Sequence, residues 1–208
     1  NLVHNQFAFL KVPESIRFEL IGNLNHGCTA KDVILHILLN YAAKSETLDR
    51  SMEFGGPGLV SLSMDERATL CNMATECSAK TGICEPDSLT IDWLLERRPE
   101  LTAEKILDGF VMPDPDAVYD GGIHIVDLSN ILPMVAHPGD PDMGIPSDPT
   151  NGAFVHEIGD VSIDIAYAGS CTAGKEDDFA YYAMVTKAAL DAGLRINEGV
   201  DCYIQFGS

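Results

Sequence analysis

The 208-residue sequence has few basic residues, with 13 Lys and Arg against 32 Asp and Glu and a formal net charge of −19. A surface of that charge repels phosphate backbones and anionic lipid headgroups, so we expect neither nucleic acid nor membrane as a partner. The same charge disfavours an anionic substrate. If the substrate is an anion, we expect much of its binding site to lie outside these residues.

Long apolar runs are also missing. None approaches the roughly 20 residues that a membrane-spanning helix needs. The first five residues, Asn1 to Asn5, lack the charged region and apolar core of a secretory signal. Six cysteines in a chain of this size without a secretory signal favour a reducing compartment, and we expect the cytoplasm.

No two cysteines are spaced as a C-x-x-C pair. Composition alone therefore gives no complete metal site, because a lone cysteine most often behaves as a small buried apolar residue. The cysteines are Cys28, Cys71, Cys77, Cys84, Cys171 and Cys202.

Strand and helix signals are clear in the first half. The alternation from Ser15 to Leu20 predicts a half-buried strand. Thr29, followed three residues later by Asp32, is a capping signal and predicts a helix from about Ala30 to Ala43. Each pattern places one apolar face against a core.

A second capping pair, Ser63 and Glu66, predicts a helix that runs to about Lys80 and stops at Gly82, a residue type that tolerates the left-handed conformation. Its many small residues predict tight packing between other elements. Further along we expect helices at about Ile91 to Arg97 and after Thr102, and a strand from Ile123 to Leu128.

The second half begins with an aperiodic segment rich in proline and glycine, Ala136 to Gly152, which predicts a long loop or a connector. The later segments predict strand, glycine-rich turn, helix and strand: Val161 to Ala168, Gly169 to Gly174, Glu176 to Ala192 and Asp201 to Phe206. That order is a βαβ unit and implies a parallel sheet. The sequence therefore predicts an α/β fold in two portions that meet in or near Ile131 to Asn151.

Cys171 lies in the turn that leaves the carboxyl end of a predicted strand, where open α/β sheets bind ligands. The helix that follows offers free backbone amides and a dipole that favour a thiolate or a bound anion. Cys171 could be a metal ligand, a nucleophile or a turn residue without a chemical role. The nucleophile is the weaker functional alternative, because no nearby His in the sequence offers a base.

Asn72 and Glu76 are four residues apart on the second predicted helix, so we expect both on one face, with Thr69 and Lys80 extending the stripe. A carboxylate on a buried helix should be paired or functional. The alternative is that this stripe is simply the solvated face.

Two of these segments resemble motifs of the aconitase and isopropylmalate dehydratase family. Gly169 to Thr172 (GSCT), with acidic residues at Glu176 to Asp178, resembles the motif that carries the first cysteine ligand of a 4Fe-4S cluster. Leu70 to Glu76 resembles the family's CNM-x-x-E helix. Further matches follow the family's order: Lys11 to Ser15, Thr29 to Leu35, Asp127 to Ser129 with Pro133, and Phe206 to Ser208.

The resemblance implies aconitase-type α/β/α domains with a parallel sheet. Residues 1–133 would be the family's second domain, and residues 134–208 would start the next domain, which carries the GSCT cysteine. It implies a 4Fe-4S hydro-lyase that reversibly dehydrates a hydroxy di- or tricarboxylic acid, such as citrate or 3-isopropylmalate. The alternative is a non-catalytic α/β fragment or subunit that acts as a scaffold or interaction domain.

The resemblance also assigns roles to individual residues. Cys171 would bind the cluster iron, with Ser170 and Thr172 beside it in the cofactor site. Asn72 would lie near the cluster, and Glu76 beside the iron-bound hydroxyl of the substrate. Both would then be catalytic residues.

The departures from the family pattern are informative. Ala173 and Gly174 follow the GSCT motif where the family usually has Asn, which suggests a branch other than the mainstream aconitases. The family's Asp/His motifs would precede Asn1, and its C-x-x-C would follow Ser208. We therefore expect an internal portion that holds no stable cluster by itself. Its implied partners are the rest of the large subunit, a swivelling domain or small subunit, and an anionic hydroxy acid.

Overall fold

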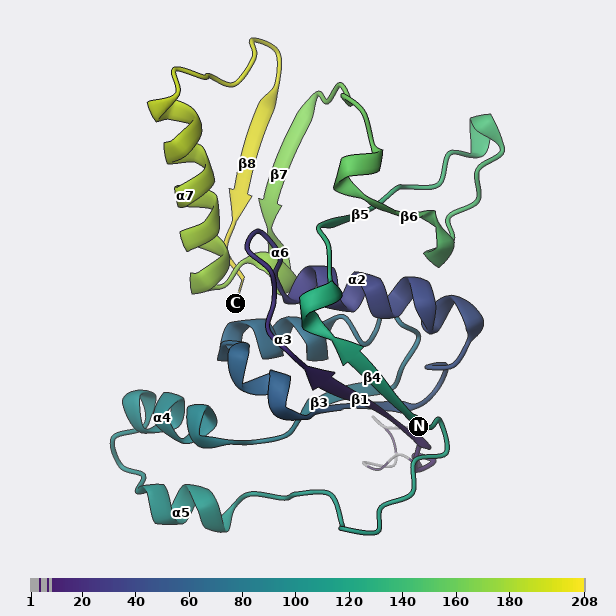
Figure 1. The fold of residues 1–208 in the computed structure, drawn as a ribbon, viewed down its shortest axis with the longest axis vertical. Helices are drawn as coiled ribbons and strands as arrows, with labels where there is room; N and C mark the ends of the chain where they lie inside the picture. The colour runs from purple at the N-terminus through teal and green to yellow at the C-terminus, as the bar shows by residue number, and fades with distance from the viewer. Residues whose placement is uncertain (1–3, 5–6, 8, 208) are drawn as a thin grey trace.

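A computed structural model of the chain describes residues 4, 7 and 9–207, apart from the side chain of Pro149. Two expectations rest on residues outside this range. Except for His4, the segment Asn1 to Asn5 is not described, and neither is Ser208, the last residue of the final family match. Figure 1 shows one sheet with its helices in the lower half and a smaller strand pair with one long helix above it.

The larger sheet is parallel throughout. Within the described residues it has four strands in the order β3-β2-β1-β4. This arrangement confirms the α/β class, because parallel neighbours require crossover connections. The strands are β1 (Ser15–Ile21), β2 (Ser51–Gly55), β3 (Thr81–Cys84) and β4 (Ile123–Asp127).

The predicted alternation in β1 is confirmed. Ile16, Phe18 and Leu20 are fully buried, whereas Arg17 and Glu19 lie on the opposite face. The buried face belongs to the core that includes residues of α2 (Ala30–Asn40) and α3 (Met64–Asn72). The strand therefore positions these two helices on one side of the sheet.

Helix α2 begins at the predicted capping pair. The Thr29 hydroxyl accepts a hydrogen bond from a first-turn amide, and the Asp32 carboxylate accepts from the Thr29 amide at 2.8 Å. The other oxygen of Asp32 accepts from the backbone amide of Met134 at 2.8 Å. The helix ends at Asn40, before the expected Ala43. One buried carboxylate thus joins α2 to the middle of the chain.

Helix α3 also begins as predicted, with the Ser63 hydroxyl accepting from the Glu66 amide at 3.1 Å. The prediction that it reaches about Lys80 is wrong. The helix ends at Asn72, and residues 73–78 form turns. The apolar side chains of these turns still pack into the core, which explains why the pattern of buried residues resembles a longer helix.

The expected stop at Gly82 is also wrong. Ser78 is the residue that adopts a left-handed φ, 58°, and the amide of Ala79 then donates to the carbonyl of Ala74 at 3.0 Å. This bond is typical of a helical C-terminus. Gly82 lies in β3, where a Cβ atom would come 2.8 Å from the Cα atom of Cys71. It serves close packing between β3 and α3 instead of a turn.

Two short helices follow β3 and lie apart from the C-terminal strands (Figure 1). Helix α4 (Ser88–Arg97) is capped by Asp87 and starts earlier than the expected Ile91. Helix α5 (Ala103–Asp108) is capped by Thr102 as predicted. The 3-10 helices of the chain are η1 (Ala42–Lys44), η2 (Pro57–Ser61), η3 (Leu128–Asn130), η4 (Pro141–Met143), η5 (Pro149–Asn151) and η6 (Val155–Glu157).

The proline- and glycine-rich segment is more ordered than the predicted loop or connector. Strands β5 (Met134–Ala136) and β6 (Gly152–Phe154) pair in antiparallel fashion at its base. Asp140 and Ile145 bridge within it. The boundary between residues 133 and 134 stays a prediction.

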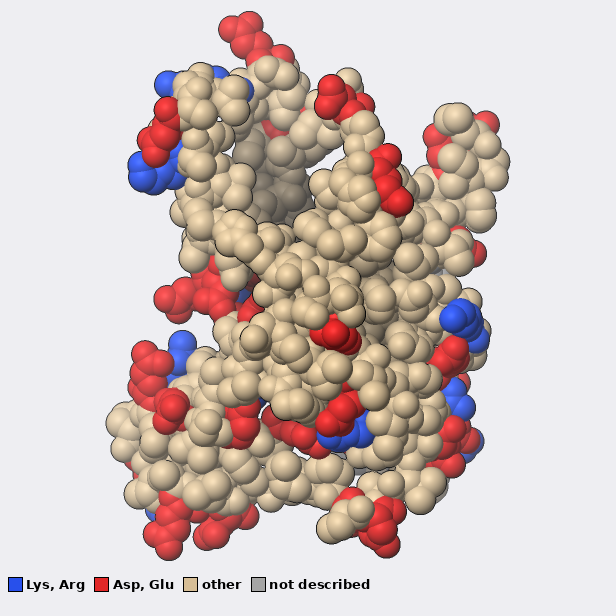
Figure 2. Space-filling model, in the orientation of Figure 1, with Lys and Arg blue, Asp and Glu red and all other residues tan. Residues whose placement is uncertain are grey.

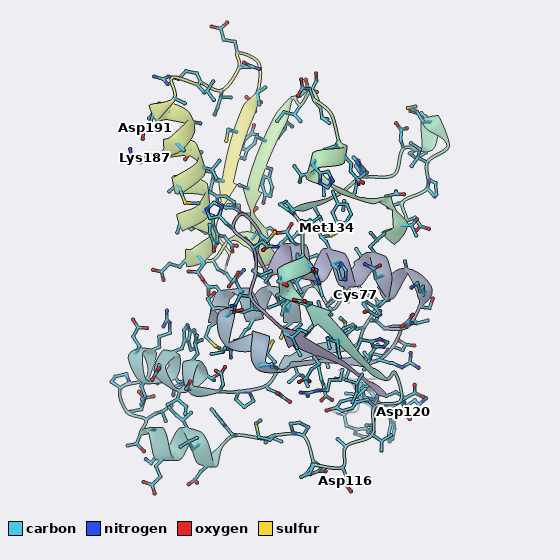
Figure 3. All side chains as sticks on the ribbon, in the orientation of Figure 1. Cys77, Asp116, Asp120, Met134, Lys187 and Asp191 are labelled. Carbon is cyan, nitrogen blue, oxygen red and sulfur yellow. The ribbon has the colours of Figure 1, made fainter. Side chains whose placement is uncertain are left out.

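The C-terminal βαβ unit is confirmed. Strand β7 (Ile165–Gly169) pairs in parallel with β8 (Asp201–Gln205), and α7 (Glu176–Asp191) connects them. Strand β7 starts later than the expected Val161, because β8 provides partners only from Ile165 onward. Figure 3 shows Lys187 and Asp191, an ion pair, on the side of α7 away from the strands. No helix of the described part is long and apolar enough to cross a membrane.

Candidate functional site

The turn after β7 has an unusual backbone. Gly169 has a φ of 122°, and a Cβ atom there would collide with the carbonyl oxygen of Gln205 in β8. Ser170 follows with a φ of 77°, which is rare for a residue with a side chain. Cys171 comes next, in the short helix α6 (Ser170–Ala173). The predicted turn therefore contains a helical segment at the carboxyl end of the strand.

The far end of this turn is fixed to the chain after β8. The amide of Gly207 donates to the carbonyl of Gly174 at 2.8 Å, and a Cβ atom on Gly174 would collide with Gly207. The Tyr182 hydroxyl in α7 donates to the carbonyl of Ala173 at 2.8 Å. Both residues that depart from the usual family pattern thus have backbone contacts that hold the turn.

The structure brings Asn72, Cys171 and Thr172 together. The Thr172 hydroxyl donates to Asn72 Oδ1 at 2.6 Å. Cys171 Sγ lies 3.9 Å from the same oxygen and 3.8 Å from the Thr172 hydroxyl oxygen. Thr172 is buried, whereas Cys171 is exposed. The last residue of α3 therefore contacts the cysteine turn, although about one hundred residues separate the two in the sequence.

A second set of contacts supports the junction formed by Asn72, Cys171 and Thr172. The Thr69 hydroxyl donates to the carbonyl of Thr172 at 3.2 Å. Lys175 Nζ donates to the Thr69 hydroxyl at 2.9 Å, to the same Thr172 carbonyl, and to Asp178 at 2.9 Å. The sequence did not single out Lys175. Its position just before α7, directly after the cysteine turn, was the available signal.

Acidic residues join the first turns of α3 and α7. The Ser63 hydroxyl donates to Asp177 at 2.5 Å, and Asp65 accepts from the Asp177 amide at 3.2 Å. Burial raises the pKa of the neighbouring Glu66, and the charges of Asp177 and Asp178 add to this effect. The acidic residues that trail the cysteine motif therefore hold α7 against α3.

Glu76 is not part of the junction. It is exposed in the turns after α3, and within the described part of the chain no hydrogen bond or ion pair involves its carboxylate. The expectation that Asn72 and Glu76 share one helical face is wrong, because α3 ends at Asn72. Lys80, which was also expected on that face, pairs instead with Asp49 at 2.8 Å.

The thiols of the chain differ in exposure, and Cys171 is one of the exposed ones. Cys28 and Cys77 are buried, and burial raises the pKa of Cys77 to about 12. Cys202 is exposed on β8. Among the described residues, no group of three or more His, Cys, Asp or Glu could hold a metal ion. Within the described residues, the exposed Cys171 therefore belongs to no such group.

Comparison with known proteins identifies the family that this chain resembles. A family model described as the aconitase family (aconitate hydratase) matches residues 1–208. The large subunit of 3-isopropylmalate dehydratase from Heliobacterium modesticaldum is 38% identical over 199 residues, 95% of this chain and 42% of the relative. The chloroplastic large subunit from Arabidopsis thaliana is 38% identical over 180 residues, 86% of this chain and 32% of the relative. The large subunit from Aquifex aeolicus is 35% identical over 199 residues, with 95% and 42% covered. The chain thus spans less than half the length of these relatives.

Proposed function

The chain belongs to the aconitase family, and from this premise we propose that it is part of a hydro-lyase acting on a hydroxy di- or tricarboxylic acid. The enzyme would reversibly remove and add water. The observation that carries the proposal is the meeting of Asn72 and Cys171 through the Thr172 hydroxyl. Relatives named as 3-isopropylmalate dehydratase favour a 3-isopropylmalate-like substrate, with a citrate-like acid as the next candidate.

We propose that Cys171 provides one ligand of a 4Fe-4S cluster. Its sulfur is exposed at a helix start, and the nearby ammonium group of Lys175 is engaged by Thr172 and Asp178. The surroundings therefore fit an iron ligand better than an ion-paired thiolate. When bound, such a cluster supplies an iron that acts as a Lewis acid at the leaving hydroxyl. Because a 4Fe-4S cluster needs further cysteines, we propose that they come from the rest of the polypeptide.

The residues around Cys171 would position it. The backbone of Ser170 turns the chain so that the cysteine leaves the end of β7, and the buried Thr172 anchors the turn to Asn72. The side-chain oxygen of Asn72 accepts this hydrogen bond from Thr172. Its amide group, for which the described residues provide no acceptor, remains available to donate to the cluster or the substrate.

Glu76 would move a proton at the leaving oxygen. It lies four residues after Asn72 in turns that the buried Cys77 fixes to the core. Because this carboxylate is exposed, it is free to contact a substrate that the rest of the enzyme holds. General acid-base groups of this kind contribute factors of about 10²–10⁴ to turnover.

Membership of the aconitase family also suggests partners and a compartment for the complete enzyme. We propose that the rest of the large subunit and a swivelling domain or small subunit complete the site, and that the enzyme works in the cytoplasm. Figure 2 shows carboxylates spread over the visible face, with only a few separate Lys and Arg groups. This acidic surface supports the proposal that cations for an anionic substrate come from the other parts.

The test is an anaerobic assay of the full-length protein with its small-subunit partner. Formation of the unsaturated acid from 3-isopropylmalate or citrate is followed by its ultraviolet absorbance. We expect dehydration of one of these acids, and loss of it when iron is chelated. If the cluster-loaded complex dehydrates no hydroxy acid, the alternative of a non-catalytic scaffold or interaction domain would replace the proposal.

A further inference from the structure

Two thiols lie side by side outside the Cys171 junction. Cys71 is in the last turn of α3, and Cys84 is the final residue of β3. Their sulfur atoms are 3.7 Å apart, and both side chains are half-buried. This separation is close to van der Waals contact, whereas a disulfide needs about 2.0 Å. The pair is therefore reduced but in reach of bond formation.

The backbone on both sides holds the pair in place. The absence of a side chain at Gly82 lets β3 approach the Cα atom of Cys71. On the other side, Cys84 Sγ lies 3.8 Å from the carbonyl of Arg67. The buried Arg67 also forms an ion pair at 2.6 Å with Asp87, three residues beyond Cys84. The end of β3 is thus fixed against α3, so the two sulfurs stay together.

The contact makes the two thiols unequal. The hydrogen bond from Cys84 lowers the pKa of Cys71, because it stabilises the thiolate. The same hydrogen bond, and then burial, raise the pKa of Cys84. A thiol of lowered pKa in contact with a thiol of raised pKa is the arrangement in which the first attacks an oxidant and the second resolves the product.

We propose that Cys71 and Cys84 form a reversible oxidation site for hydrogen peroxide. The Cys71 sulfur attacks one peroxide oxygen, so that an S–O bond forms, the O–O bond breaks and hydroxide leaves. The Cys84 sulfur then attacks the sulfenic sulfur of Cys71, so that the S–S bond forms and the S–O bond breaks. Two thiols lose two electrons and two protons in total, and the peroxide becomes two waters.

The disulfide would act on the neighbouring junction. Cys71 directly precedes Asn72, whose side chain anchors Thr172. Shortening the sulfur separation draws the end of α3 toward β3 and shifts Asn72 relative to Cys171. This consequence rests on the proposed function, whereas disulfide formation does not.

The test uses the reduced full-length protein, treated with hydrogen peroxide, alkylated and mapped as peptides by mass spectrometry. We expect one cross-linked pair that joins Cys71 to Cys84, has lost two hydrogens, and disappears with dithiothreitol. The buried Cys28 and Cys77 should remain alkylatable after unfolding. In a Cys84→Ser variant, Cys71 should instead be trapped by dimedone as a sulfenic acid.

The inference is wrong if Cys71 and Cys84 are recovered as free thiols at a peroxide dose that oxidises the exposed Cys202. The mapping needs no turnover and no cluster, so a protein without hydro-lyase activity can still show the cross-link. Equally, an active enzyme without the cross-link would overturn only this inference.

Discussion

The Thr172 hydroxyl donates a hydrogen bond of 2.6 Å to the side-chain oxygen of Asn72 and so joins the end of α3 to the turn after β7. Each residue lies beside a candidate function: Asn72 follows the Cys71–Cys84 pair, and Thr172 follows the proposed iron ligand Cys171. Weakening this bond should therefore lower both the stability of this chain and the activity of the proposed full-length enzyme.

Replacing Thr172 with Val removes the hydroxyl and keeps the shape of the side chain. We expect the free energy of unfolding to fall by about 1 kcal/mol, the typical value of one hydrogen bond. We also expect lower turnover, because the cysteine turn loses its anchor. Denaturant unfolding and the dehydration assay measure the two effects. Thr186→Val, on the exposed side of α7, is the matched control and should leave turnover unchanged.

Replacing Gly169 with Ala should disrupt the turn. The new Cβ atom would meet the Gln205 carbonyl, and a φ of 122° is strained for any residue with a side chain. We expect a lower thermal midpoint and weaker binding of iron by the full-length protein. Gly159→Ala, where a Cβ atom has open space, is the control. Equal midpoints for the two variants would show that β7 and β8 do not constrain the turn.

Because of the Arg67–Asp87 pair, the free energy of unfolding should decrease at acidic pH. Burial alone would raise the pKa of Asp87, but the hydrogen bond and charge of Arg67, together with hydrogen bonds from the Thr90 and Leu89 amides, outweigh it and lower this pKa. A carboxyl whose pKa is lower in the folded state stabilises the protein above its unfolded pKa. That stability is lost as the pH falls through the folded value, which lies below about 4.

The variant for this pair is Asp87→Asn, which keeps a good helix cap. It should be less stable by about 1–3 kcal/mol at pH 7, the contribution of a hydrogen bond to a charged group. Urea unfolding between pH 7 and pH 3 should show the two proteins converging in acid. A constant difference across that range would mean that the charge of Asp87 does not stabilise α3.

Replacing Glu76 with Gln tests the proton-transfer role. The change keeps the size of the side chain and removes its charge, so turnover should fall by about 10²–10⁴-fold at full cluster content. Stability should change by no more than about 0.5 kcal/mol, because the carboxylate is exposed. Glu104→Gln, on the exposed side of α5, serves as the control. Near-normal turnover of the Glu76 variant would leave this carboxylate without a catalytic role.

Local signals predicted much of the fold. The capping pairs at Thr29 and Ser63 lie within one turn of the helices they start, so neighbouring residues alone determine them. The alternation in β1 reports directly which side chains face the core. By contrast, β2 and β3 were not predicted. They are short, and β2 is buried on both faces, so its strand identity depends on pairing such as that of Phe18 with Phe54.

In the candidate site, too, local features could be predicted from the sequence, whereas contacts between distant residues could not. The motifs around Asn72 and Cys171 are local, and both residues could be named from the sequence. That they meet depends on where α3 ends, which the long run of small residues concealed. The bond between Lys175 and Thr69 could not be foreseen, because the two residues come from different halves of the chain. The same holds for Gly82, whose role is set by the backbone of Cys71.

The proposed role of Cys171 as a ligand of cluster iron is tested by the iron and acid-labile sulfide content of the full-length protein after anaerobic reconstitution. The comparison is between Cys171→Ala and Cys202→Ala. Both replace an exposed thiol of the C-terminal βαβ unit. We predict that the Cys202 variant retains a full 4Fe-4S cluster, whereas the Cys171 variant loses it. Equal cluster content in the two proteins would show that Cys171 is not a ligand of the cluster.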